Sequence, residues 1–192
     1  MKFQPGEGIA ALIFDIDGTL LDTMTVHYQA WRETLVDYGI DLDRAWFDRF
    51  AGQTSSDIVA LLNEETEASL DAGELSMIKD QAFVRHVPLI QPIHAVREIA
   101  EHYAARMPLG LATNEHFGVA NIVMRSSGLA ALFQAMVTAD EVEHPKPAPD
   151  MFVECARRLG VSPAACHVFE DSSYGIEAAR AAGMTVTNVR EI

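Results

Sequence analysis

The sequence predicts an α/β protein built on a parallel sheet. Beyond residue 92, short apolar runs alternate with segments of helical periodicity, and the last three of these helical segments each end at a glycine. Such alternation implies right-handed crossovers between parallel strands. The expected strands are PLGLAT (108–113), QAMVTA (134–139), CHVFE (166–170) and MTVTNV (184–189), and the expected helices are 94–107, 115–128, 148–160 and 174–183.

The first strand is expected much earlier in the chain. The segment AALIFDID, residues 10–17, is short, apolar and rich in β-formers at its centre, which is typical of a fully buried strand. Asp15 falls at its carboxyl end.

From residue 22 to about residue 88 the signals are helical throughout. A first helix follows Asp22, a second spans 43–52, a third begins after the possible caps at 54–56, and a fourth follows Asp71. We therefore expect an α/β core made of residues 1–21 and 89–192, interrupted by an all-helical domain of residues 22–88. Hinges are expected near residues 21–23 and 88–92.

The composition is that of an acidic globular protein. Fourteen basic against twenty-eight acidic residues give a net charge of −14, and Lys and Arg form no run, so we expect neither nucleic acid nor a membrane as partner. No apolar run approaches the roughly 18 residues of a membrane span, and residues 1–10 lack a signal-peptide pattern, so we expect a cytoplasmic protein, and a monomer. Cys155 and Cys166 lack metal-ligand spacing and are expected to be buried, reduced thiols.

Polar and charged residues stand at the carboxyl ends of the predicted strands, which is where open parallel sheets bind ligands. Four carboxylates at one edge would repel each other, and a single lysine cannot balance them, so a bound cation is expected. Mg²⁺ suits an all-oxygen set, whereas zinc would recruit cysteine or histidine. The residues at these ends are Asp15 and Asp17, Thr113 and Asn114, Lys146, and Glu170 and Asp171.

The spacing of Asp15 and Asp17 indicates that the two carboxylates have different chemical roles. Gly18 breaks the strand after Asp17, so that this carboxylate can swing over Asp15. One aspartate can then attack phosphorus to form an aspartyl-phosphate, while the other protonates the leaving oxygen and later activates water. Simpler readings stay open for single residues: Lys146 between two prolines is equally typical of a surface turn, and His27 of a helix surface.

Four stretches of the chain resemble the motifs of the haloacid dehalogenase-like (HAD) hydrolases. They are DIDGT at 15–19, the apolar strand ending in Thr113, Lys146 within HPKPAPD, and the acidic pair in VFEDSSYGIEAARAAGM. The resemblance covers essentially the whole chain and implies a HAD-like Rossmannoid sheet with an inserted α-helical cap. The subfamily that it most resembles contains sugar-phosphate phosphatases and β-phosphoglucomutases, in particular the fructose-1-phosphate/6-phosphogluconate phosphatase type.

The resemblance implies a role for each matching residue. Asp15 is expected as the nucleophile and Asp17 as the general acid/base. Mg²⁺ is expected on Asp15, the backbone carbonyl of Asp17, Glu170 and Asp171. Substrate binding, including the transferring phosphoryl group, is expected from Asp15, Asp17, Thr113, Asn114 and Lys146, together with His27 and Gln53 from the insert.

These roles predict a Mg²⁺-dependent phosphatase for small sugar phosphates such as fructose 1-phosphate or 6-phosphogluconate. The alternative is a β-phosphoglucomutase, which returns the phosphoryl group to a sugar. Thr19 stands where mutases tend to have valine and Ser55 about where they carry an arginine, whereas His27 matches a mutase histidine. A non-catalytic binding protein would be expected to have lost the nucleophile or the metal carboxylates, and a dehalogenase does not need the second aspartate or a metal.

Overall fold

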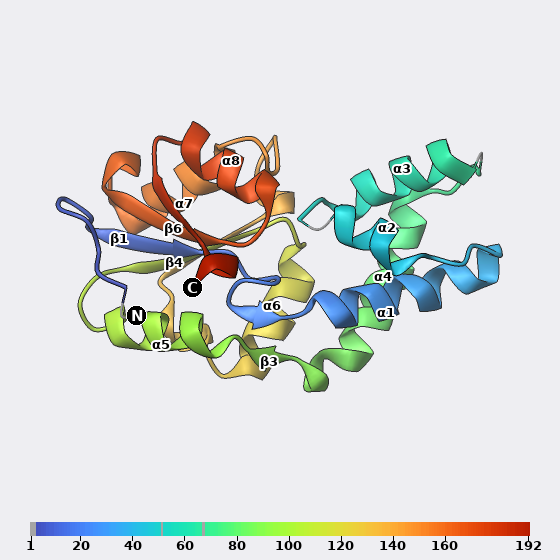
Figure 1. Cartoon of the computed structure of the whole chain (residues 1–192), viewed down its shortest axis with the longest axis horizontal. Coiled ribbons are helices and arrows are strands. Elements are labelled where there is room, and N and C mark those ends of the chain that lie inside the picture. Colours follow the sequence, from blue (N-terminus) through green and yellow to red (C-terminus); the bar gives the residue numbers. More distant parts are fainter. Residues whose placement is uncertain (1–2, 51, 67) are drawn as a thin grey trace.

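A five-stranded parallel sheet forms the centre of the protein, in a computed structural model that describes residues 3–50, 52–66 and 68–192 (Figure 1). The strand order is β5-β4-β1-β6-β7, so the first strand lies in the middle of the sheet and is completely buried. This confirms the predicted strands with ends trimmed by a few residues. The strands are β1 (Ala11–Phe14), β4 (Leu109–Thr113), β5 (Ala135–Thr138), β6 (Cys166–Glu170) and β7 (Thr185–Asn188).

Helices cover both faces of this sheet, as the alternating pattern predicts. Leu12 and Phe14 of β1 share an apolar cluster with α5 (His94–Tyr103) and α6 (Phe117–Ser127) on one face. The alternate residues of β1, Ala11 and Ile13, pack on the other face against α7 (Asp150–Leu159) and α8 (Ser173–Ala181). Each fully buried Leu or Phe contributes about 1.5–3 kcal/mol of hydrophobic stabilisation, so the central strand anchors both layers.

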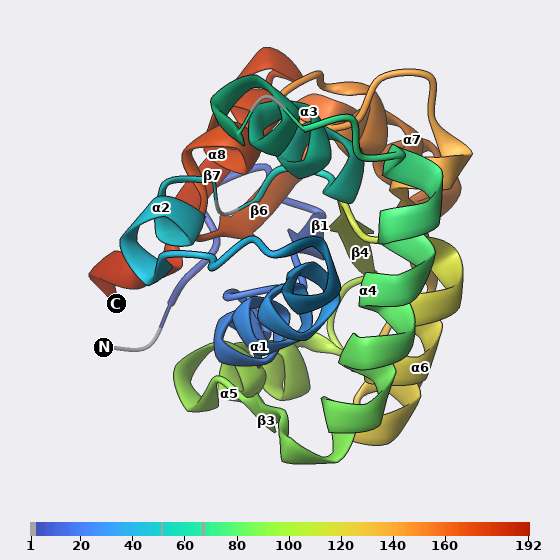
Figure 2. The ribbon, with the colours of Figure 1, turned by 90° about the vertical axis from the view of Figure 1, so that its right-hand side faces the viewer.

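A helical insert stands between β1 and β4 in the sequence and forms a lobe beside the strand ends (Figure 2). Asp43 and Asp71 each accept a hydrogen bond from a backbone N–H in the first turn of the helix that follows, and so cap that helix. A third apolar cluster, around Trp31 and Leu75, lies within this lobe. Its helices are α1 (Met24–Leu35), α2 (Arg44–Arg49), α3 (Ser55–Thr66) and α4 (Ala72–His86).

The insert joins the rest of the chain through a feature that the sequence did not reveal. Leu21–Asp22 (β2) pairs antiparallel with Gln91–Pro92 (β3), at the two places where hinges are predicted. Phe83 of α4 also packs into the apolar cluster of the sheet. The insert is therefore attached both by a short two-stranded ribbon and by apolar contact.

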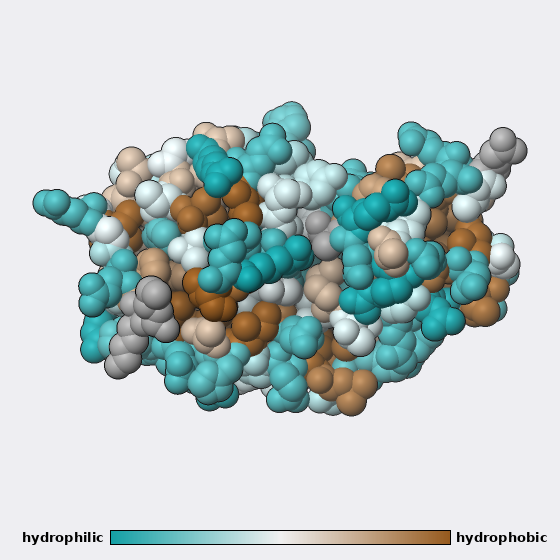
Figure 3. Space-filling model, viewed as in Figure 1, coloured by the Kyte–Doolittle hydropathy of each residue, from teal (hydrophilic) through white to brown (hydrophobic). Residues whose placement is uncertain are grey.

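Short 3₁₀ turns connect the remaining segments: η1 (Val36–Tyr38), η2 (Val87–Leu89), η3 (Ala130–Leu132), η4 (Ala139–Glu141), η5 (Pro163–Ala165) and η6 (Val189–Glu191). Both cysteines are buried free thiols, as expected. Among the described residues, none of the helices has the length and apolar character needed to cross a membrane. The face in Figure 3 is mostly hydrophilic, with apolar residues in small separate groups.

Candidate active site

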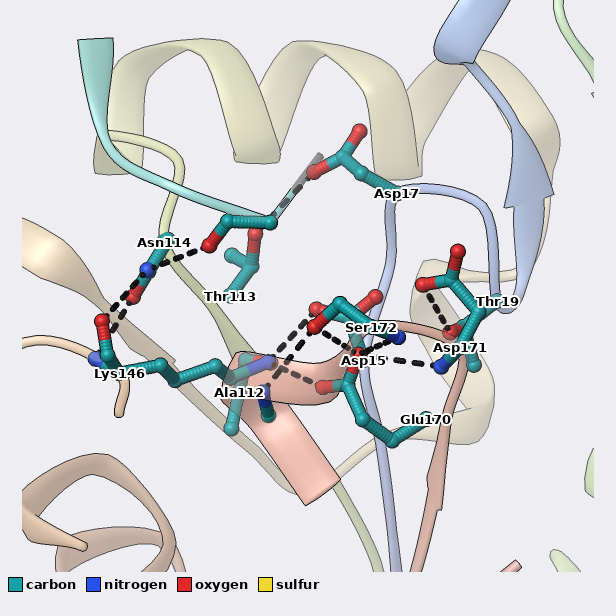
Figure 4. A network of polar contacts seen from close by, with 12 residues as sticks. Asp15, Asp17, Thr19, Ala112, Thr113, Asn114, Lys146, Glu170, Asp171 and Ser172 are labelled. Carbon is teal, nitrogen blue, oxygen red and sulfur yellow. Dashed lines mark hydrogen bonds and ion pairs between the residues drawn. The ribbon is translucent and has the colours of Figure 1, made fainter. Parts of the chain in front are cut away.

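The strand ends bring four of the predicted residues into one buried cluster (Figure 4). Asp15 directly follows β1, Thr113 ends β4, Glu170 ends β6, and Lys146 comes from the loop between η4 and α7. All four are at most 6% exposed. Parallel strands share one carboxyl edge, which is why residues more than 150 positions apart meet here.

The Lys146 ammonium lies at the centre of the cluster. It donates to Asp15 Oδ1 at 2.7 Å, to Glu170 Oε2 at 2.7 Å and to the Ala112 carbonyl at 2.9 Å. Three acceptors use all three N–H bonds of an ammonium. The reading of Lys146 as a surface lysine is therefore wrong, because the side chain is almost completely buried and fully engaged.

The pKa values of this cluster reflect a shortage of positive charge. Burial and then the neighbouring Glu170 raise the pKa of Asp15 well above its usual value, against the opposing effect of Lys146. Burial alone would lower the pKa of Lys146, but the carboxylates of Asp15 and Glu170 outweigh burial and raise it. One ammonium thus stays charged between two carboxylates that it cannot fully compensate.

Glu170 is fixed by the turn that follows its strand. Its Oε1 accepts from the backbone N–H groups of Asp171 and Ser172 at 3.1 and 3.0 Å, and from the Ser172 hydroxyl at 2.9 Å. The same hydroxyl accepts from the Gly175 N–H and caps helix α8. A Cβ at Gly175 would overlap the Glu170 carboxylate, so this close approach requires glycine.

Asp171 completes a group of carboxylates suited to a metal ion. It accepts from Thr19 at 3.3 Å and from Arg190 at 2.7 Å. One carboxylate oxygen each from Asp15, Glu170 and Asp171 lie within 4.8 Å of one another, and all three residues are buried. Burial and Glu170 raise the pKa of Asp171 against the effect of Arg190, so a cation here would relieve repulsion. An all-carboxylate set fits Mg²⁺ better than zinc.

Asp17 points toward the insert and contacts other partners. Its Oδ1 lies 3.0 Å from His27 Nε2, and its Oδ2 accepts from the Thr113 hydroxyl at 3.2 Å. Burial alone would raise the pKa of Asp17, but the hydrogen bond and charge of His27 outweigh it and hold that pKa at about 2. His27 is buried and stacks on Phe83, so its reading as a helix-surface residue is wrong.

Asn114 and Gln53 lie where the insert meets the core. The Asn114 side-chain amide donates to the Gly52 carbonyl at 2.8 Å and accepts from the Lys146 backbone N–H at 3.0 Å. The Gln53 amide donates to the Tyr174 hydroxyl at 2.7 Å. One loop of the insert is therefore hydrogen-bonded to the segment that follows β4 and to helix α8.

A pocket between the insert and the strand ends contains every predicted site residue. Its insert side is formed by Met24, His27, Trp31, Phe47, Phe50, Gly52, Gln53, Ser55, Ile58 and Lys79, and its core side by Asp15, Asp17, Thr113, Asn114, Glu115, Lys146, Glu170, Asp171 and Ser172.

Ser172, Lys79, Arg190 and Glu115 are polar or charged residues of this site that the sequence patterns did not predict. Ser172 had a signal, since it stands at a helix start as a typical N-cap. Lys79 also had one, because it shares a helical face with the apolar Leu75 and Phe83. Arg190 and Glu115 had none, because their pairing with Asp171 and Lys79 joins segments that no local pattern connects.

The comparisons with known proteins identify the family of this chain. The model of the haloacid dehalogenase-like hydrolases matches residues 12–189, and the chain belongs to that family. The expected family, fold and hydrolase class are thereby confirmed.

The relatives include one protein named as a phosphatase and one named as a phosphoglucomutase. Fructose-1-phosphate phosphatase YqaB of Escherichia coli is 41% identical over 186 residues, which are 96% of this chain and 98% of YqaB. The β-phosphoglucomutase of Bacillus subtilis is 28% identical over 93% of this chain and 82% of its own length. The crystal structure of CbbY from Rhodobacter sphaeroides in complex with phosphate has a TM-score of 0.84 and 25% identity, and covers 93% of this chain and 84% of that one.

Gly175 tests how tightly the Glu170 carboxylate is held. Gly175→Ala should destabilise the fold by about 1–3 kcal/mol, because the added Cβ overlaps Glu170. In the matched control Gly118→Ala, on an exposed turn of α6, the Cβ meets nothing within 4 Å. That change should be neutral or stabilise by up to about 1 kcal/mol. Denaturant unfolding measures both; equal effects at the two positions would contradict the assignment.

Proposed function

We propose that this protein is a Mg²⁺-dependent phosphatase that hydrolyses small sugar phosphates, such as fructose 1-phosphate or 6-phosphogluconate, through an aspartyl-phosphate on Asp15. The observation that carries the proposal is the Asp15 carboxylate, held at 2.7 Å by Lys146 beside a cluster of carboxylates at the floor of the pocket. The relationship to YqaB supports the substrate class. We expect a monomeric enzyme in the cytoplasm.

Asp15 is the proposed nucleophile. Its carboxylate oxygen forms a bond to phosphorus while the bond from phosphorus to the sugar oxygen breaks. Lys146 orients the carboxylate through Oδ1 and places its positive charge beside the transferring phosphoryl group, whose oxygens Thr113 and Asn114 are proposed to bind as well. When bound, Mg²⁺ would be held by Asp15, Glu170, Asp171 and the backbone carbonyl of Asp17, and it would supply positive charge against the phosphoryl group.

Asp17 is the proposed proton carrier. The leaving sugar oxygen takes a proton held by the contacting pair of Asp17 and His27, and Asp17 then accepts a proton from the water that attacks phosphorus. That attack releases phosphate and restores the Asp15 carboxylate. A pKa of about 2 keeps Asp17 ionised in the present arrangement, which suits the second of these roles.

Residues 22–88 are the proposed cap over a core of residues 1–21 and 89–192. The contact of Gly52 with Asn114, and that of Gln53 with Tyr174, hold one loop of the insert against the strand ends. A closed cap excludes bulk water and contacts the sugar part of the substrate, and His27 and Gln53 are the proposed contacts. This arrangement favours small metabolites over phosphoproteins.

A β-phosphoglucomutase is the second candidate, because His27 contacts Asp17 and the relatives include a mutase. Two observations favour water as the acceptor. The pocket presents the neutral Ser55 near the expected place of a mutase arginine, and Thr19, where mutases tend to have valine, donates to Asp171.

The Asp15 carboxylate and the metal can be tested together. Asp15→Asn should lower phosphate release from sugar phosphates by roughly 10³-fold or more, because the amide cannot replace the nucleophile. Its unfolding temperature should stay equal or rise, since one of three crowded carboxylates becomes neutral. Chelation by EDTA should abolish the wild-type rate and added Mg²⁺ should restore it. Asp37→Asn, an exposed change of the same type, is the control; an active Asp15→Asn would reject the assignment.

An assay with β-glucose 1-phosphate and a trace of glucose 1,6-bisphosphate shows whether water or a sugar accepts the phosphoryl group. We expect release of inorganic phosphate to exceed formation of glucose 6-phosphate, because the pocket has a neutral Ser55 at the relevant place. Coupled assays for the two products measure both rates in one reaction. Isomerisation faster than phosphate release would identify a mutase instead.

A further inference from the structure

A second buried ammonium stands at the pocket, outside the proposed catalytic cluster. Lys79 comes from helix α4 of the insert, and its side chain is 2% exposed. It donates to Glu115 Oε2 at 2.9 Å and to Asp80 Oδ1 at 3.2 Å, and it lies 5.2 Å from the centre of the Phe83 ring. Lys79 and Glu115 both line the pocket.

Glu115 reaches this lysine from the core. It follows Thr113 by two residues, directly after β4, and its side chain is 9% exposed. Its other oxygen, Oε1, accepts from the His116 N–H at 3.1 Å. Burial would lower the pKa of Lys79, but Glu115 and Asp80 outweigh burial and raise it. The lysine is therefore a charged group that the protein already compensates.

The rest of the insert side offers little to attract an anion. His27, the other basic group there, contacts Asp17. The remaining side chains at that side are apolar or neutral, including Trp31, Phe50, Gln53 and Ser55. The overall charge of −14 further disfavours anionic groups at long range.

We propose that the pair of Lys79 and Glu115 makes the enzyme select phosphate esters of otherwise neutral sugars over esters that carry a second anionic group. Glu115 is the specificity-determining residue. A carboxylate or second phosphate at the insert side would meet a lysine that is already paired and a like charge on Glu115, in a buried environment where such repulsion is strong. This inference rests on the proposed phosphatase function and ranks the substrates within it.

The first test needs only the wild-type protein with Mg²⁺. We expect kcat/KM for fructose 1-phosphate to exceed the values for 6-phosphogluconate and for fructose 1,6-bisphosphate, since the latter two carry a second anion. An equal or higher value for either of the two would overturn the inference. No phosphate release from any sugar phosphate would overturn the proposed function and the inference with it.

The second test changes the proposed residue. Glu115→Gln keeps the size of the side chain but removes one of the two carboxylates that compensate Lys79, so the ammonium, left with Asp80 alone, can attract a second anion. The ratio of kcat/KM for 6-phosphogluconate to that for fructose 1-phosphate should rise by about tenfold or more. Glu98→Gln, on the exposed side of α5, is the matched control and should leave the ratio unchanged.

A double variant separates charge from shape. Lys79→Gln combined with Glu115→Gln removes both members of the pair, so the ratio should return close to the wild-type value. Thermal unfolding of each variant confirms that the fold is kept. Phosphate release with an unchanged ratio in Glu115→Gln, or with the same rise in the double variant, would overturn the inference and leave the phosphatase function standing.

Discussion

The structure depends on one ammonium placed between two buried carboxylates. Lys146 bonds Asp15 and Glu170 at 2.7 Å each, and thereby ties a loop beyond β5 to the ends of the two adjacent strands β1 and β6. Removing the ammonium would leave both carboxylates buried without a positive partner, and breaking a buried pair in this way typically costs about 3–5 kcal/mol. Two features of the fold permit this contact. The central strand β1 lies next to β6, so that Asp15 and Glu170 are neighbours, and Gly175 has no Cβ that would overlap the Glu170 carboxylate.

The same edge carries more negative than positive charge, and this imbalance connects structure to chemistry. Burial raises the pKa of Asp15 and of Asp171, so both carboxylates gain from a further cation. Asp17 differs from them because His27, from the insert, keeps its pKa at about 2. Two aspartates separated by one residue thus have opposite environments, one shared with Lys146 and one with the insert. Such divergence is what distinct roles in attack and proton transfer require.

Much of the fold and of the proposed site could be predicted, because both follow from local patterns. Buried strands are short apolar runs, and parallel strands must end at one edge, which brings Asp15, Thr113 and Glu170 together. No local sequence pattern shows which side of a helix faces another lobe, so from the sequence His27 could be assigned to the surface as readily as to the site. The ribbon of β2 with β3 and the bond from Arg190 to Asp171 join segments only through the finished fold.

In the proposed mechanism Asp15 carries the phosphoryl group. Borohydride reduces an acyl phosphate to an alcohol, so quenching the wild-type enzyme with it during turnover of fructose 1-phosphate and Mg²⁺ should convert the aspartate at position 15 to homoserine. Peptide mass spectrometry identifies the reduced residue. We expect homoserine at position 15, and only when substrate is present. An unchanged Asp15 during rapid turnover, or reduction at Asp17 instead, would contradict it.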